Sequence, residues 1–456
     1  MTTPPCPVPF RNPPQPTPPE PKQPPKPNRR PPTPLLRIRA PPKRPEEPMT
    51  DVLTPLAPPA LAARVAGLAS PSAFGAVLGA SPITAISFAG GSPAAEALPW
   101  AELIAATAVV LESPARSAVL DYSGHQGSPA LRAWIAEREG VDADRVVITN
   151  GALHGLSLSF LATVDPADVV VVENPVYPLA VKTLQLTGAE IHPVPLDADG
   201  LRTDVLEERL RAGLRPRALY TVPDFHNPTG RTLSPERRAH LVELADTYGF
   251  VVVSDNPYAE LRGHGARPAD LDVASDRVIR VNSFSKTFGP GLRLGWAVVP
   301  EWVRPGVLDL RARGDQHAST LTQAVVAELV SRPSFFDGLV GAAASLYRER
   351  AVVLEGALRA ELGDAIEVSA PDGGVFAWPR FVDESVSVDD IAAAAARAGV
   401  VILPGSQFAA RAGSAGGDAD AADIARHART SFGQASPEQI HEGVRRLGAA
   451  YREVAR

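Results

Sequence analysis

The amino-acid sequence predicts an α/β fold, with a mostly parallel β-sheet followed by a smaller α+β region. Between residues 146 and 299, short β-branched runs recur that are apolar throughout instead of alternating with polar residues. Such runs are typical of strands that are buried on both faces of a sheet. Helical stretches lie between several of the runs, and strands interleaved with helices favour a parallel sheet.

The predicted strands are residues 146–149, 169–172, 219–222, 250–253, 278–281 and 295–299. The best-defined helix covers residues 235–248, with Ser234 as its N-cap and Pro235 at its first position. Ligands of parallel sheets bind at the carboxyl ends of the strands. Polar residues of this sequence collect at those ends, which predicts a binding site there.

The sequence changes character beyond about residue 315. Helical patterns cover residues 322–330 and 336–362, and two predicted strands, 374–378 and 400–403, flank an alanine-rich helix at 391–398. We therefore expect an N-terminal arm over residues 49–95, a large domain over 96–315 and a small C-terminal domain over 316–456.

Residues 1–48 form a proline-rich extension, with 20 of the 48 prolines of the chain. Because this segment has little apolar surface to bury, we expect it to be disordered with polyproline II character. It is either a docking tail for proline-binding modules or a dispensable extension upstream of Met49. We favour the second interpretation, since a more ordinary sequence begins at Met49.

The composition excludes several classes of protein. The net charge is −6, but residues 1–48 hold about +6 and the remaining chain about −12. An acidic body argues against a nucleic-acid partner. The single cysteine, Cys6, allows no intrachain disulfide, and the nine histidines lack metal-ligand spacing. With neither a bilayer-spanning apolar stretch nor an apolar signal-peptide core, the sequence favours the cytoplasm.

The run from residue 282 to 295 is the strongest indication of function. Ser283 and Ser285 precede Lys286, and Arg293 follows it across two glycines. A lysine can form an imine with an aldehyde, while hydroxyls and an arginine can hold a phosphate. Pyridoxal 5′-phosphate (PLP) carries both groups. Taken alone, the run fits a surface loop equally well.

Three other motifs follow predicted strands. Asp255 and Tyr258 come after residues 250–253, where an aspartate could pair with a protonated pyridine nitrogen or simply cap a turn. Asn227 lies in an Asn-Pro-Thr-Gly turn that would hold its side chain rigidly. Gly151 joins a strand to a helix whose free N–H groups could bind phosphate.

Together these motifs resemble, in order and spacing, the fold-type I, class I/II PLP-dependent aminotransferases over roughly residues 80–450. The residues around Lys286 most resemble the 2-aminoadipate and kynurenine aminotransferase branch, which also supplies the catalytic domain of MocR-type regulators. The resemblance implies a large domain with a mostly parallel seven-stranded sheet. It also implies ping-pong transfer of an amino group from an L-amino acid to a 2-oxo acid.

The resemblance implies a role for each matching residue. Lys286 forms the imine and then moves the substrate proton, and Asp255 pairs with the ring nitrogen. The family often has Ser-Gln at positions 152–153, so only main-chain contacts carry over there. The other implied cofactor contacts are Asn227 and Tyr258 to the phenolic oxygen, Ser283, Ser285, Arg293 and the amides of Ala152 and Leu153 to the phosphate, Tyr177 against the ring, and Tyr122 reaching the partner's site in a homodimer.

The substrate is expected to meet three of the matching residues. Arg429 resembles the arginine that grips the α-carboxylate, and Asn227 and Gly91 match residues that contact or close over the substrate. Arg426 lies three residues from Arg429 and stays an alternative.

Two other functions remain open. A PLP-dependent lyase or decarboxylase would use the same cofactor contacts. A MocR-like ligand sensor is less expected, because the roughly 80 residues before the family-like part show no winged-helix pattern. The sequence does not indicate which amino acid is the substrate.

Overall fold

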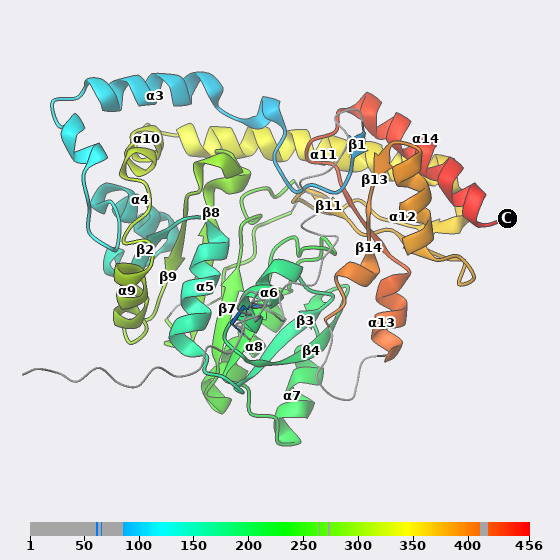
Figure 1. Ribbon diagram of the computed structural model, residues 1–456, viewed down its shortest axis with the longest axis horizontal. Coiled ribbons are helices and arrows are strands. Elements are labelled where there is room, and N and C mark those ends of the chain that lie inside the picture. The colour runs from blue at the N-terminus through cyan, green and yellow to red at the C-terminus, as the bar shows by residue number, and fades with distance from the viewer. Residues whose placement is uncertain (1–60, 63–64, 66–84, 264, 272–273, 411–417) are drawn as a thin grey trace, which may run out of the picture. The chain divides into compact units, whose positions relative to one another are not determined.

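The structure is a computed structural model that describes residues 61, 62, 65 and 85–456, apart from 264, 272–273 and 411–417 (Figure 1). The predicted extension, residues 1–48, and most of the predicted N-terminal arm, residues 49–95, lie outside the described residues. Within the described part of the chain, no helix has both the length and the apolar character that crossing a membrane requires.

A mixed sheet forms the centre of the α/β region. In spatial order its described strands are β2 (Val146–Thr149), β9 (Gly295–Val298), β8 (Val278–Ser283), β7 (Val251–Asp255), β6 (Ala218–Thr221), β3 (Val169–Asn174), β4 (Glu190–Asp197) and β5 (Gly200–Leu201). Strands β9 and β5 run antiparallel to their neighbours, and the other pairs are parallel. All six predicted strands are confirmed; the two-residue β5 is the edge strand beyond the seven expected.

The strands are buried on both faces, as their composition predicts. In β3, Val170 and Val172 pack into one core cluster and Val171 into another. Helices α5 (Ala152–Thr163) and α6 (Pro178–Gln185) cover the first face, whereas α7 (Thr203–Arg211) and α8 (Pro235–Tyr248) cover the second (Figure 1). Helix α8 has the predicted bounds, and the Ser234 hydroxyl accepts a hydrogen bond from the N–H of Arg237 at 3.3 Å.

The remaining elements extend the fold on both sides of this sheet. Before and after it come α3 (Trp100–Glu112), α4 (Pro129–Glu139), α9 (Arg304–Arg313) and α10 (Thr320–Val330). The C-terminal region contains α11 (Phe335–Leu362), α12 (Val388–Arg397), α13 (Asp418–Ala425) and α14 (Pro437–Val454). Its short strands are β10 (Ile366–Glu367), β11 (Phe376–Ala377), β12 (Arg380–Phe381), β13 (Val400–Val401), β14 (Leu403–Pro404) and β15 (Ala428–Ser431). Strand β1 (Ile86–Ser87) pairs with β13, so the N-terminal segment joins the C-terminal region.

Candidate active site

A cavity of about 350 Å³ lies at the carboxyl ends of β6, β7 and β8. It contains most of the residues that the sequence analysis selects, from segments far apart in the chain. Its lining residues are Ala152, Leu153, Leu156, Tyr177, Leu179, Val222, Asn227, Asp255, Pro257, Tyr258, Ser283, Ser285, Lys286, Pro290 and Arg293.

Lys286 lies on a short 3₁₀ turn directly after β8. Its Nζ donates a hydrogen bond to the carbonyl oxygen of Gly91 at 2.7 Å and lies 5.3 Å from the centre of the Tyr258 ring. Burial, and to a smaller extent the positive charges of Arg429 and Arg293, lower the pKa of Lys286 to about 8, although Asp255 opposes that change. A substantial fraction of such an amine is neutral near pH 8, and only the neutral amine is a nucleophile.

Asp255 ends β7 and is buried beside Lys286. Its Oδ2 accepts a hydrogen bond from the Tyr220 hydroxyl at 3.0 Å. Its Oδ1 is buried without a hydrogen-bond partner among the described residues. Burial raises the pKa of Asp255 to about 7, although Tyr220 and Lys286 oppose that rise. A buried carboxylate oxygen of this kind is stabilised by a cationic donor, which a protonated pyridine nitrogen provides.

Asn227, Tyr258 and Arg429 form a connected group beside Lys286. The Asn227 Oδ1 accepts a hydrogen bond from Arg429 Nη1 at 2.8 Å, and the Asn227 side chain is also hydrogen-bonded to Tyr258. Burial raises the pKa of the Tyr258 hydroxyl. The hydroxyl therefore stays protonated near neutral pH and can donate a hydrogen bond.

The candidate phosphate cradle lies where β2 leads into α5. Gly151 has φ +82°, and a Cβ atom at this position would lie 2.9 Å from Arg293 Nη2. Arg293 Nη2 donates to the carbonyl of Asn150 at 3.0 Å, and the Ser283 hydroxyl donates to that of Ser285 at 2.8 Å. A helix N-terminus beside two hydroxyls and a guanidinium is a suitable site for a phosphate dianion.

Arg429 and Arg426 occupy different environments. The buried Arg429 lies with its guanidinium carbon 4.3 Å from the centre of the Phe376 ring and donates to the carbonyl of Ala89. Burial lowers its pKa to about 10. Arg426 instead donates to Glu384 and to the carbonyl of Val382. Of the two, Arg429 therefore lies beside the cavity, next to Asn227 and Lys286.

Two predicted residues have contrasting positions. Tyr177 lines the cavity, and burial raises the pKa of its hydroxyl. Tyr122 is 82% exposed and does not line the cavity of its own chain; its ring contacts His317 edge-on, with centroids 6.0 Å apart.

Sequence reasoning missed some residues of this region. Tyr220 looks like a core residue of an apolar strand, and only the pairing of β6 with β7 places its hydroxyl beside Asp255. Glu173 and His226 form a buried pair at 3.2 Å next to Asn227. Glu173 directly follows four valines in β3. Because a buried charge is costly unless it is paired, a glutamate at this place indicates a specific role.

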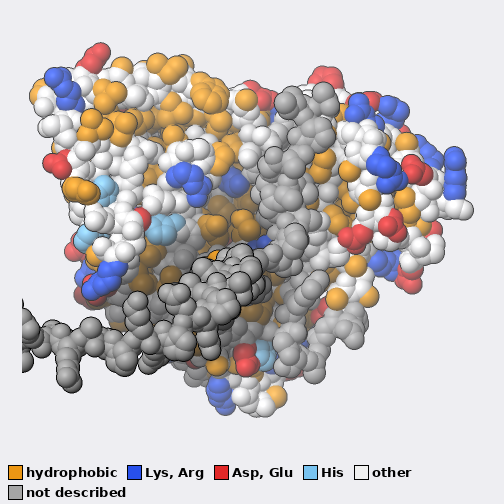
Figure 2. All heavy atoms as spheres, in the orientation of Figure 1, with side chains coloured by type: hydrophobic (Ala, Val, Ile, Leu, Met, Phe, Trp, Pro, Cys, Tyr) orange, Lys and Arg blue, Asp and Glu red, His pale blue; other side chains and the backbone are white. Residues whose placement is uncertain are grey.

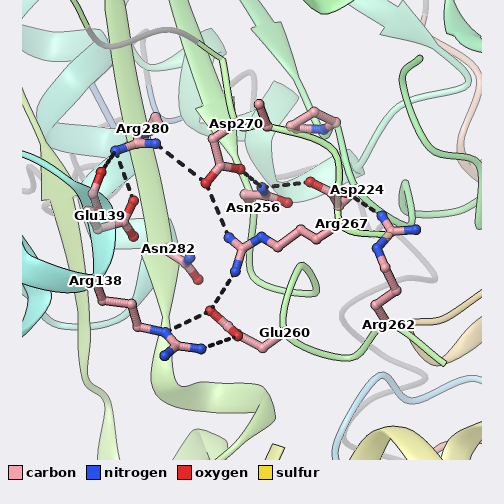
Figure 3. A network of polar contacts seen from close by, with 12 residues as sticks. Arg138, Glu139, Asp224, Asn256, Glu260, Arg262, Arg267, Asp270, Arg280 and Asn282 are labelled. Atoms are coloured by element: carbon pink, nitrogen blue, oxygen red, sulfur yellow. Dashed lines mark hydrogen bonds and ion pairs between the residues drawn. The ribbon is translucent and has the colours of Figure 1, made fainter. Parts of the chain in front are cut away.

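A polar network includes Asp224, three residues before Asn227, and Asn256, which follows Asp255 (Figure 3). Asp224 contacts Arg238 and Arg262 at 3.0 and 2.7 Å and accepts a hydrogen bond from Asn256 at 2.9 Å. Figure 3 shows the network continuing through Asp270 to Arg280 and Glu139. The network therefore links the loop before Asn227 to the segment after Asp255.

Residues 91–447 match the protein family described as "Aminotransferase class I and II". The chain belongs to this family. It is 32% identical to an aromatic-amino-acid aminotransferase from Thermococcus litoralis, over 81% of this chain and 88% of that protein. It is 33% identical to a 2-aminoadipate transaminase from Thermus thermophilus, over 80% and 89%.

The solved structure of a relative contains a ligand derived from the cofactor. The alpha-aminoadipate aminotransferase from Thermus thermophilus, complexed with N-(5′-phosphopyridoxyl)-L-leucine, matches this fold with a TM-score of 0.75 and 32% identity, over 82% of this chain and 93% of that chain. The free Asp255 oxygen and the phosphate cradle fit the same cofactor. The chain is thus a PLP-dependent aminotransferase of fold type I, as its sequence predicts.

Proposed function

We propose that this aminotransferase transfers an amino group from an L-amino acid to a 2-oxo acid by a ping-pong cycle, with Lys286 as its acid–base residue. The observation that carries the proposal is that Lys286 and Asp255 share one buried cavity, with pKa values of about 8 and about 7. Proton transfer is most efficient when the pKa of the catalytic group lies near the working pH.

The cofactor, when bound, supplies an electron sink for the pair released as the substrate Cα–H bond breaks. Lys286 Nζ takes that proton and returns it later in the cycle. The Asp255 carboxylate holds a proton on the pyridine nitrogen. Tyr258 and Asn227 hold the phenolic oxygen, and Tyr177 packs on the ring. The proposed phosphate ligands are Ser283, Ser285, Arg293 and the backbone N–H groups of Ala152 and Leu153.

Arg429 is the proposed ligand of the substrate α-carboxylate. From β15 it donates to Asn227 and to the carbonyl of Ala89, two residues before Gly91 in the segment that would close over the substrate. The planar guanidinium can form two parallel hydrogen bonds to a carboxylate, which fixes the orientation of Cα relative to Lys286.

The half-reaction tests this function directly. The protein loaded with PLP should convert to its pyridoxamine phosphate form with at least one amino acid, and a 2-oxo acid should reverse the change. Aromatic amino acids and 2-aminoadipate come first in the donor panel, because two relatives are named for them. If the panel yields ammonia or carbon dioxide without pyridoxamine phosphate, the lyase or decarboxylase alternative replaces the proposal.

We also propose a homodimer with shared active sites. Large apolar side chains are exposed on α3 and the turn after it, and Figure 2 shows this apolar surface over the helix. Ile104 is 72% exposed and Leu120 is 76% exposed, which is unfavourable unless a partner covers them. A second copy would bring Tyr122 toward the neighbouring cavity. Because the single cysteine allows no intrachain disulfide, we also propose the reducing cytoplasm as the compartment of this protein.

Mixed dimers test the role of Tyr122. Lys286→Ala and Tyr122→Ala proteins should each be impaired alone. If Tyr122 acts across the interface, a mixed dimer contains one fully wild-type site, so mixing should restore activity. If mixing restores nothing although subunits exchange, Tyr122 does not act in the partner's site.

A further inference from the structure

The loop that presents Asn227 has a strained backbone. Phe225, two residues earlier, has φ +50° and is 1% exposed. A non-glycine residue in this conformation costs about 1–3 kcal/mol and persists only where its surroundings fix it. The two neighbours of Phe225, Asp224 and His226, are both buried and both held by other side chains. The loop is therefore anchored on two sides.

His226 is held in one orientation by Thr229. Its Nδ1 accepts a hydrogen bond from the N–H of Thr229 at 3.4 Å and lies 3.0 Å from the Thr229 hydroxyl. Because a backbone N–H can only donate, this arrangement assigns the ring proton to Nε2. Nε2 lies 3.2 Å from Glu173 Oε2 but is not aligned as a hydrogen bond, so the contact is mainly electrostatic.

Glu173 connects three segments from its place in β3. Its Oε1 accepts a hydrogen bond from the Thr221 hydroxyl at 2.6 Å, and its Oε2 accepts one from the N–H of Val222 at 2.8 Å. With His226, these contacts join the ends of β3 and β6 to the loop that carries Asn227. The side chain is 1% exposed, and its closest contact with a titratable side chain among the described residues is the one to His226 Nε2.

The negative charge of Glu173 calls for an explanation beyond packing. A neutral glutamine could accept from the N–H of Val222 through its oxygen and donate to the Thr221 hydroxyl through its amide nitrogen, because a hydroxyl can also accept. Buried charges are often no more stabilising than neutral replacements. The charge also acts on Asp255, whose pKa it raises. Five titratable or charged side chains of the described residues interact electrostatically with Asp255. They are Lys286, Tyr220, Glu173, Tyr177 and Tyr258.

We propose that Glu173 is a positioning residue for the reaction: it fixes Asn227 through His226 and adds a buried negative charge that acts on Asp255. The inference rests on the proposed roles of Asn227 and Asp255 at the cofactor. Removing the charge should make the protons of neighbouring groups easier to lose, whereas removing only the His226 link should disturb Asn227 and leave the charge in place.

Glu173→Gln tests the charge in the PLP-loaded enzyme. We expect kcat to fall at least about tenfold with little change in KM. The midpoint of the pH-dependent change in cofactor absorbance should move to lower pH by about 1, as expected when a buried negative charge that acts on the site is removed. The inference is overturned if the variant keeps both the absorbance midpoint and the kcat of the wild type. It is also overturned if the Tm falls while the absorbance midpoint stays the same.

Glu139→Gln is the matched control. Glu139 is also a buried carboxylate, paired with Arg280 at 3.0 Å and accepting a hydrogen bond from Trp296 at 2.9 Å, in the network of Figure 3. This variant should lose thermal stability but keep kcat and the absorbance midpoint. If it shifts the midpoint as much as Glu173→Gln, the effect is not specific to Glu173 and the inference fails.

His226→Gln separates positioning from charge and serves if Glu173→Gln does not fold. It should lower kcat while the absorbance midpoint stays within about 0.3 of wild type, because Glu173 keeps its charge. Wild-type kcat in this variant would refute the positioning role. The proposed function has its own test, since an active Lys286→Ala would refute that function whatever the Glu173 variants do.

Discussion

Replacing Arg429 with lysine should selectively impair the use of amino acids. Arg429 is buried between the Phe376 and Phe408 rings, at 4.3 and 5.0 Å, and donates to Asn227. Truncating one partner of a buried, hydrogen-bonded charge pair costs about 2–5 kcal/mol. At about 1.4 kcal/mol per factor of ten, kcat/KM should fall roughly 30- to 4,000-fold. Lysine keeps the charge, so we expect the lower end.

Steady-state kinetics on Arg429→Lys and Arg426→Lys would measure this effect. Arg426 contacts Glu384 and backbone carbonyls instead of the cavity, so its lysine variant should keep kcat/KM within about twofold of wild type. The cofactor absorbance and Tm of both variants should resemble wild type. The carboxylate assignment is refuted if Arg429→Lys keeps wild-type kcat/KM, or if Arg426→Lys loses as much.

Three other substitutions test individual parts of the cavity. Lys286→Ala should abolish turnover and the absorbance band of lysine-bound cofactor while far-UV circular dichroism stays unchanged; residual wild-type turnover would contradict its role. Gly151→Ala should weaken cofactor binding roughly 5- to 140-fold in Kd, because strain at φ +82° and the approach to Arg293 cost about 1–3 kcal/mol. Equilibrium dialysis would measure the Kd, and an unchanged value would contradict the role of this segment in holding the phosphate. Because burial raises the pKa of Asp255 from 3.8 to about 7, its carboxylate destabilises the cofactor-free fold increasingly from pH 4 to 7. Asp255→Asn should therefore raise the Tm of the cofactor-free protein at pH 8 but not at pH 4, and calorimetry showing equal effects at both would contradict that pKa.

The sequence predicted the buried parallel strands well because each is a continuous apolar run, such as residues 169–172. It did not indicate β4, because Pro193 and Pro195 interrupt an alternating pattern near the sheet edge. The cavity residues were predictable where they lie at the carboxyl ends of strands, as Asp255 and Ser283 do. Tyr220 and Glu173 were not, because their importance depends on strand register, which hydrophobic pattern alone does not determine.

Arg429 is synthesised much later than the proposed cofactor ligands. Every proposed cofactor ligand of the same chain has been synthesised once residue 293 emerges, whereas Arg429 comes from β15, near the C-terminus. Contacts between such distant segments form late, because chain closure must precede them. The proposed phosphate ligands lie at or just after the carboxyl ends of β2 and β8, which β9 joins in the sheet, so they can come together only once β9 is complete. A chain truncated before β15 would therefore keep every proposed phosphate ligand but lack Arg429.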